Sequence, residues 1–220
     1  MDKISKEYQE IIHEVKILPV EQLDIERVEK LIRAYIADKN YEKALEVLRV
    51  VEEREKNNPS INSEFGYCLV ELKQFDEAAK YFLKAKNQGR EDAWIYSQLG
   101  WAYRNVEKYK EALEAYLKAQ QLGDKVAWTN AEIGMCYKEL GKYEEAIEKL
   151  LEARRLYIAE GKAPYSEDLE LAYCYAALGD KNKAKYHMDS SIEALGAYAE
   201  SEEYLKKRFT EIKEMINSLK

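Results

Sequence analysis

The sequence repeats one short pattern at a constant interval of 34 residues. The pattern is an aromatic residue followed three positions later by alanine. Its first four copies are YEKA, FDEA, YKEA and YEEA, which place alanine at Ala44, Ala78, Ala112 and Ala146. A weaker fifth copy places Ala184 after an interval of 38 residues. A period of this length is typical of stacked helical units, because one unit alone cannot bury its apolar surface. The repeat therefore predicts an all-α array.

Each unit has the apolar spacing of two amphipathic helices. In the third unit, Leu99, Tyr103 and Val106 recur at intervals of three and four residues, as one face of a helix does. After a short turn, Tyr109 and Ala112 begin a second face of the same kind. With only three prolines and nine glycines, the chain favours long helices and short connections. The four additional residues of the longer interval lie near the segment LYIAEGKAP, and they predict a helix that is about one turn longer.

The units resemble the tetratricopeptide repeat, in which W-x2-L-G-x2-Y is followed by A-x3-F. The third unit carries this pattern in Tyr96, Leu99, Gly100, Tyr103, Ala112, Tyr116 and Ala119. The pattern differs at the tryptophan position, which holds Asn62, Tyr96 and Asn130, and the terminal proline of each repeat is missing. The resemblance covers residues 25–196. It implies a right-handed superhelical solenoid of about five helix-turn-helix repeats with capping helices at both ends.

The repeat spacing also predicts boundaries along the chain. We place a capping helix at 1–24, repeats at 25–58, 59–92, 93–126, 127–164 and 165–196, and a second capping helix at 197–220. The first segment has an apolar stripe before Pro19, formed by Ile4, Tyr8, Ile11 and Val15. The last segment has an apolar seam formed by Leu205, Phe209, Ile212, Ile216 and Leu219. Repeat arrays need end helices that cover the last apolar face, so capping is the favoured role of both segments. Pairing of the C-terminal seam with a partner helix or a second copy is the alternative.

Charge and hydropathy exclude several classes of partner. The chain has 42 acidic and 35 basic residues and a net charge of −7, which argues against binding to a nucleic-acid backbone. The amino terminus has no apolar stretch of a signal peptide. The longest uncharged run, Ala93 to Tyr103, is much shorter than the roughly 18 apolar residues of a membrane helix. We therefore expect a cytoplasmic protein that binds neither nucleic acid nor membrane.

The reactive residues suggest packing rather than catalysis. Cys68, Cys136 and Cys174 all lie two residues after the glycine position of a repeat, where a small buried side chain is expected, and their spacing fits no metal site. His13 and His187 have no ligand or catalytic partner at a suitable spacing. No glycine-rich phosphate loop is present. We expect no enzyme activity, no metal and no cofactor.

The resemblance also indicates a binding surface. In this family the first helix of each repeat lines a concave groove through positions 2, 5, 9, 12 and 13. The residues at these positions that we expect to bind a partner are Tyr67, Trp94, Trp101, Arg104, Trp128, Met135, Lys138 and Tyr173. Trp101 should be at least partly exposed. For Trp94 and Trp128, packing between adjacent first helices is an equal alternative, because large aromatic residues are mostly buried.

These residues favour a non-catalytic adaptor with an aromatic, locally basic groove that binds a protein or peptide. Arg104 and Lys138 would complement an acidic or carboxylate-bearing partner. The lysine and asparagine pattern of repeat proteins that clamp chaperone carboxyl termini is absent at positions 5 and 9. The alternative is a structural protein that assembles through its terminal helices, including a homodimer formed by the C-terminal helix.

Overall fold

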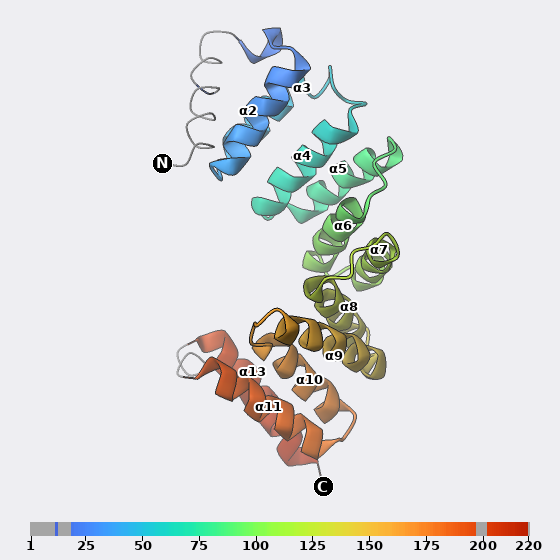
Figure 1. The fold of residues 1–220 in the computed structure, drawn as a ribbon, viewed down its shortest axis with the longest axis vertical. Coiled ribbons are helices and arrows are strands. Elements are labelled where there is room, and N and C mark those ends of the chain that lie inside the picture. Colours follow the sequence, from blue (N-terminus) through green and yellow to red (C-terminus); the bar gives the residue numbers. More distant parts are fainter. Residues whose placement is uncertain (1–11, 13–18, 197–201, 220) are drawn as a thin grey trace. The chain divides into compact units, whose positions relative to one another are not determined.

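The computed structural model describes residue 12 and residues 19–196 and 202–219. These residues form helices and connections without a β-strand (Figure 1). In chain order, a short 3-10 helix, η1 (Val20–Gln22), precedes five pairs of consecutive helices and a last helix. The pairs are α2 (Ile25–Ala37) with α3 (Tyr41–Val51), α4 (Pro59–Glu71) with α5 (Phe75–Asn87), α6 (Ala93–Asn105) with α7 (Tyr109–Gln121), α8 (Ala127–Glu139) with α9 (Tyr143–Ala159), and α10 (Tyr165–Ala177) with α11 (Lys181–Leu195); the last helix is α13 (Glu203–Ser218).

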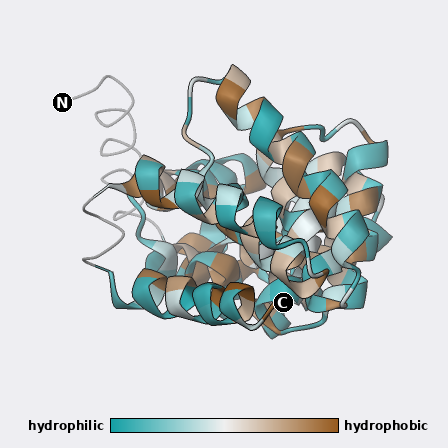
Figure 2. Ribbon diagram, turned by 90° about the horizontal axis from the view of Figure 1, so that it is seen from below, coloured by the Kyte–Doolittle hydropathy of each residue, from teal (hydrophilic) through white to brown (hydrophobic). Residues whose placement is uncertain are grey.

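The all-α helical-repeat fold predicted from the sequence is confirmed. The chain divides into two compact units, residues 1–108 and 109–220, and each is described by itself. Hydrophobic and hydrophilic residues alternate along individual helices, as the amphipathic spacing predicts (Figure 2). The predicted N-terminal stripe of Ile4, Tyr8, Ile11 and Val15, and also His13, lie outside the described residues. The division into five repeats and two caps stays a prediction.

Local sequence explains where the helices start. Asp24 accepts a hydrogen bond from the backbone N–H of Arg27 at 2.9 Å, and Asp92 accepts one from the backbone N–H of Ile95 at 2.9 Å. These side chains satisfy backbone donors that have no partner inside the helix. Pro59 occupies the first residue of α4, where the missing N–H costs least. The starts of α2, α4 and α6 are therefore specified locally.

The turns within the pairs share one backbone conformation. In every pair, the residue that directly follows the C-cap of the first helix has a positive φ: Lys39 (56°), Lys73 (60°), Glu107 (59°), Gly141 (72°) and Gly179 (82°). Three of these positions hold a residue with a side chain, which is strained in this left-handed region. The period seen in the sequence thus extends to the backbone.

The core of the N-terminal unit is closed around Gly66 of α4. A Cβ atom at Gly66 would lie 2.7 Å from the Phe82 ring of α5, so the absence of a side chain allows the two helices to approach. Phe65 stacks on Tyr81 with ring centroids 4.3 Å apart. Phe65 and Phe82 are buried. The missing side chain of Gly66 therefore permits the close packing of α4 on α5.

In the C-terminal unit, α9 has 17 residues, whereas α7 has 13. The longer helix predicted from the four additional residues is confirmed. α13 packs on α10 and α11 (Figure 1). Its Leu205, Ile212 and Ile216 are buried in one cluster with Leu169 of α10 and Met188 of α11. Phe209 packs against the same cluster, so four residues of the predicted C-terminal seam contact the same chain.

The cysteines occupy the buried position that the repeat predicts. Cys68, Cys136 and Cys174 are fully buried, as are Ala34 and Ala102 at the equivalent positions of the other two repeats. None of the three forms a disulfide bond within the described part of the chain. Burial in apolar surroundings raises the pKa of Cys68 and of Cys174 to about 12. The prediction that these residues fill space is confirmed.

Candidate partner-binding surfaces

Position 9 of the repeats is partly accessible, as expected. Tyr67, Trp101, Met135 and Tyr173 are all half-buried. Position 5 differs from the expectation. Its residues in the second to fifth repeats, Ser63, Ser97, Ala131 and Leu169, are between 0% and 5% exposed, so they do not line an open groove. The accessible surface of the first helices therefore includes position 9 but not position 5, and it is formed by fewer positions than the family pattern implies.

The N-terminal unit brings Trp94 and Tyr67 together. Trp94 is 38% exposed, and its ring lies 6.4 Å from Tyr67 of α4 and 5.8 Å from Phe82 of α5. Tyr67 in turn meets Tyr41 of α3 edge-on at 6.2 Å. The two alternatives for Trp94 are therefore not exclusive, because the side chain packs on neighbouring helices and still presents an accessible surface.

Each tryptophan of this unit has an arginine close to its ring. The Arg90 guanidinium lies 4.9 Å from the Trp94 ring centroid, and the Arg104 guanidinium lies 5.5 Å from that of Trp101. Arg104 follows Trp101 by three residues on α6 and is half-buried. Arg90 also forms an ion pair with Asp92 at 3.2 Å. A guanidinium near an aromatic ring is a favourable pair for binding carboxylates at an interface.

Arg90 and Tyr41 were not among the predicted site residues. Arg90 lies in the connection between α5 and α6, and it donates a hydrogen bond to the Ser63 hydroxyl of α4. The family pattern assigns groove positions only on first helices, so a loop arginine gives no signal in it. Tyr41 is the aromatic residue of the first YEKA copy, and the sequence indicated only a packing role for it.

Lys138 is not the open positive charge that the sequence suggested. Its Nζ atom lies 2.6 Å from Glu170 and 2.9 Å from Glu139, and its side chain is 10% exposed. Burial alone would lower the pKa of Lys138, but the two carboxylates raise it above its usual value. Arg208 of α13 also forms an ion pair with Glu170, with 3.1 Å between the guanidinium and the carboxylate. The charge of Lys138 is thus already compensated within the unit.

Tyr173 belongs to the same arrangement. Its ring centroid lies 5.4 Å from Lys138 Nζ and 5.1 Å from the Arg208 guanidinium. The ring also packs against the cluster that α13 forms with α10 and α11. The structure therefore places Lys138 and Tyr173 where the last helix docks.

Trp128 and Met135 line a hollow of about 530 Å³ in the C-terminal unit. Trp128 is half-buried, and its ring meets Tyr116 of α7 edge-on at 5.8 Å. Tyr157, Tyr165 and other residues of α9 and α10 complete the lining. As with Trp94, packing and partial exposure coexist at Trp128.

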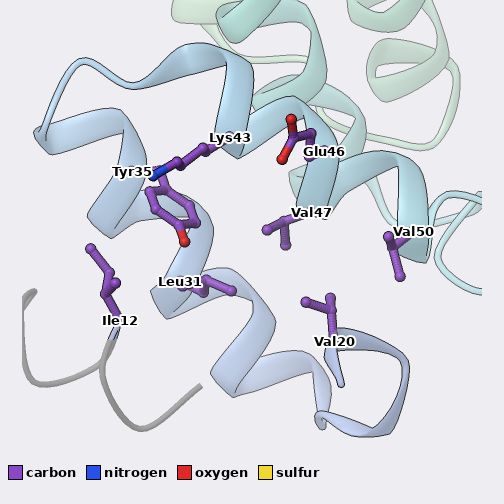
Figure 3. Close-up of a pocket in the computed structure, with 8 residues that line it drawn as sticks. All are labelled: Ile12, Val20, Leu31, Tyr35, Lys43, Glu46, Val47 and Val50. Atoms are coloured by element: carbon purple, nitrogen blue, oxygen red, sulfur yellow. The ribbon is translucent and has the colours of Figure 1, made fainter. Parts of the chain in front are cut away.

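A second hollow lies in the N-terminal unit, between η1, α2 and α3 (Figure 3). Its volume is about 340 Å³, and apolar side chains such as Leu31 and Val47 make up most of its wall. Lys43 lies over the ring of Tyr35 at 5.8 Å. None of the predicted site residues lines it, and we assign it no role.

Two negative findings concern the described part of the chain. There, no helix has the length and apolar character needed to span a membrane. Histidine, cysteine and carboxylate side chains of these residues also form no group of three that could bind a metal.

Comparisons with known proteins agree with the architecture. Two family models, each described as tetratricopeptide repeat, match residues 30–98 and residues 95–122 and 129–153. The solved structures that resemble the chain include YrrB, a tetratricopeptide protein with an unusual peptide-binding site (19% identity, 94% of this chain and 99% of that chain, TM-score 0.73). They also include MamA from Desulfovibrio magneticus RS-1 (19% identity, 88% and 96%, TM-score 0.67) and the Cut9–Hcn1 hetero-tetramer (16% identity, 96% and 40%, TM-score 0.69). No curated protein sequence matches the chain.

The fold defines a protein of stacked helical hairpins. The matched models together cover more than half of the sequence, and the chain belongs to the tetratricopeptide repeat family. The solved structures are less than 25% identical and show the fold alone.

Proposed function

We propose that this chain is a non-catalytic adaptor that binds a protein or peptide through accessible aromatic residues on its first helices. The observation that carries the proposal is the partial exposure of Trp94 and Trp101 in one unit, each with an arginine within about 6 Å of its ring. Tryptophan, tyrosine and arginine supply most of the binding energy at protein interfaces. The repeat scaffold supports a role in protein–protein interaction. YrrB, of the same fold, has a peptide-binding site, and Cut9 assembles with Hcn1.

Charge indicates the kind of partner that this surface takes. Arg90 and Arg104 place two guanidinium groups beside the tryptophans in a protein of net charge −7. Arg90 already pairs with Asp92, but a guanidinium has five N–H donors and can bind a further carboxylate. The proposed partner segment therefore presents carboxylates to the N-terminal unit. Trp128 and Met135 in the C-terminal unit provide further apolar contact.

Affinity capture from native lysate tests this proposal. The double variant Trp94→Ala, Trp101→Ala should capture at least tenfold less partner than the wild type, since each large aromatic residue at an interface contributes about 2 kcal/mol or more. Tyr186→Ala is the matched control, because Tyr186 is 62% exposed but lies on the second helix α11. Circular dichroism confirms that both variants are folded. Undiminished capture by the double variant would contradict the proposal.

Self-association is the rival function, and we propose that α13 is a cap instead. Leu205, Ile212 and Ile216 are buried against α10 and α11, so the seam covers the end of its own chain. Phe209 and Leu219 are the half-buried members of the seam, and Phe209 packs against the same cluster. Light scattering over a range of concentrations separates the two functions. A tight dimer that dissociates with Phe209→Glu would favour assembly, whereas a monomer favours the adaptor.

A further inference from the structure

The hollow lined by Trp128 lies where α8, the end of α9 and the start of α10 meet. Its walls include Met135 of α8, Tyr157 of α9, and Tyr165 and Glu167 of α10. Its volume of about 530 Å³ is in the range of roughly 300–1,000 Å³ that is typical of ligand sites. We call this hollow the Trp128 cavity.

The irregularity of the repeat builds one wall of the Trp128 cavity. α9 begins at Tyr143, in register with Tyr109 of α7, but it is 17 rather than 13 residues long. Tyr157 lies in the additional turn, and Lys162 and Ala163 follow it in the connection to α10. A repeat of regular length would lack the turn that carries Tyr157. The insertion therefore adds a wall to the cavity as well as lengthening the helix.

The cavity contains a buried carboxylate that has no counter-charge. Glu167 is 7% exposed, and among the described residues it forms no ion pair and no hydrogen bond to another side chain. Burial raises the pKa of Glu167, and the neighbouring Asp168 and Glu170 raise it further. Those two neighbours differ from it, since Asp168 binds Arg154 and Glu170 binds Lys138. Glu167 has only a hydrogen bond with its own backbone, and a buried carboxylate is costly unless it is paired, so a cation that enters the cavity would stabilise its charged form.

A second carboxylate and three aromatic rings complete the environment. Glu132 lines the cavity, is 3% exposed and accepts a hydrogen bond from the Tyr116 hydroxyl at 3.3 Å. Burial raises the pKa of Tyr157, and so do the charges of Glu167, Glu160 and Glu132. The phenol therefore lies within a negative field. Aromatic faces beside carboxylates form a typical environment for an organic cation.

Lys162 is the one cation among the described residues that line the cavity. Its side chain is 63% exposed and forms a surface ion pair with Glu160 at 2.8 Å. Its Nζ atom lies 5.6 Å from the Tyr157 ring centroid. An exposed pair of this kind contributes little stability and is easily rearranged. Lys162 thus marks the rim and shows that the Tyr157 ring accepts a positive charge.

We propose that the Trp128 cavity receives an arginine side chain of the partner protein. The inference rests on the proposed adaptor function, because the arginine belongs to the bound partner. A guanidinium is less strongly hydrated than an ammonium, stacks on aromatic faces and pairs with carboxylates through several donors. Glu167 would accept its hydrogen bonds, and Trp128, Tyr157 and Tyr165 would contact its plane and its alkyl chain.

A nuclear magnetic resonance titration of the full chain tests this proposal with a defined probe. The probe is N-acetyl-arginine-N-methylamide, and its neutral isostere, the corresponding citrulline compound, is the control. The indole signal of Trp128, identified with Trp128→Phe, should shift saturably with the arginine probe and remain unchanged with citrulline. Glu167→Gln should weaken binding of the arginine probe about tenfold or more, because a charge-assisted hydrogen bond is lost.

Two more variants make the test specific. Glu148→Gln removes the same charge from an exposed residue of α9 and should change the affinity less than twofold. Tyr157→Leu keeps an apolar side chain but removes the ring, and it should weaken binding about fivefold even if Glu167→Gln fails to fold. Equal shifts with citrulline, or full affinity in both Glu167→Gln and Tyr157→Leu, would overturn the proposal. Tighter binding of spermidine than of the arginine probe would overturn the assignment to a protein side chain.

The outcome can be distinguished from failure of the adaptor function. The Trp94 and Trp101 substitutions lie in the N-terminal unit, and their effect is measured by partner capture. Loss of the Trp128 response would leave that capture result standing. Undiminished capture by those variants, with an intact arginine response, would contradict the adaptor proposal alone.

Discussion

His187 on α11 places its Nδ1 atom 2.6 Å from the Oδ1 atom of Asp168 on α10. Asp168 is only 1% exposed and also accepts hydrogen bonds from Arg154 Nε and Ser190 Oγ, each at 2.8 Å. The His187 ring stacks on Tyr175 at 5.5 Å. One buried carboxylate thus links α9, α10 and α11 at the point where the repeat interval lengthens, and we infer that it stabilises the irregular end of the array.

Replacing this carboxylate should be costly. Asp168→Asn keeps the shape of the side chain but removes its charge, which leaves the Arg154 guanidinium without its buried counter-ion. We expect the free energy of unfolding to fall by about 3 kcal/mol, measured by urea denaturation at pH 7. Asp189→Asn on the exposed side of α11 is the control and should change stability by less than about 0.5 kcal/mol. A similar fall in the free energy of unfolding in both variants would show that the hydrogen bonds and ion pairs of Asp168 do not stabilise the fold.

The same carboxylate should make stability depend on pH. Burial alone would raise the pKa of Asp168, but hydrogen bonds from His187, Arg154 and Ser190 lower it below its usual value of 3.8. Because the folded state has the lower pKa, the contribution of Asp168 is complete above about pH 4 and is lost as pH falls below that value. The difference in unfolding free energy between the wild type and Asp168→Asn should therefore shrink between pH 4 and pH 2. A constant difference over that range would contradict the assignment.

The sequence predicts the helices well because their causes are local or periodic. The spacing around Ala112 and Ala146 sets the second helices, and four additional residues lengthen α9. The buried position of Cys136 follows from its register with Ala102. Each of these features depends on residues within one helix or on a repeat that recurs along the chain.

The candidate site is less predictable, because its charges meet through the fold. Lys138 and Glu170 are 32 residues apart, and a family pattern that treats each repeat separately does not show that they pair. Arg90 lies in a connection and approaches Trp94 only when α4, α5 and α6 are stacked. Glu167 also carries no pattern of its own. Its importance depends on burial and on the missing counter-charge, and neither can be read from a single helix.

One turn residue offers a stabilising substitution. Lys73 joins α4 to α5 with a φ of 60°, where a side chain costs about 1 kcal/mol and glycine costs almost nothing. Lys73→Gly should therefore raise the unfolding free energy by up to about 1 kcal/mol. Lys80→Gly makes the same change inside α5 and should lower it by about 1 kcal/mol. Thermal unfolding of the two variants measures the difference, and a loss of stability in both would contradict this account of the turn.

The thiols should be inert in the folded protein. Cys68 and Cys174 are fully buried, and burial raises their pKa to about 12, so at pH 8 neither the reactive thiolate nor access for a reagent is present. Cys136 is equally buried. We expect 5,5′-dithiobis(2-nitrobenzoate) to label none of the three within minutes under native conditions and all of them in 8 M urea.

Because labelling then requires opening of the repeats, its rate in the native protein should rise in Asp168→Asn at Cys174, which packs beside α9. Rapid labelling of Cys136 in the native wild type would mean that the rotation of α8 about its axis is wrong, and the placement of Trp128 and Met135 in the cavity would have to be abandoned with it.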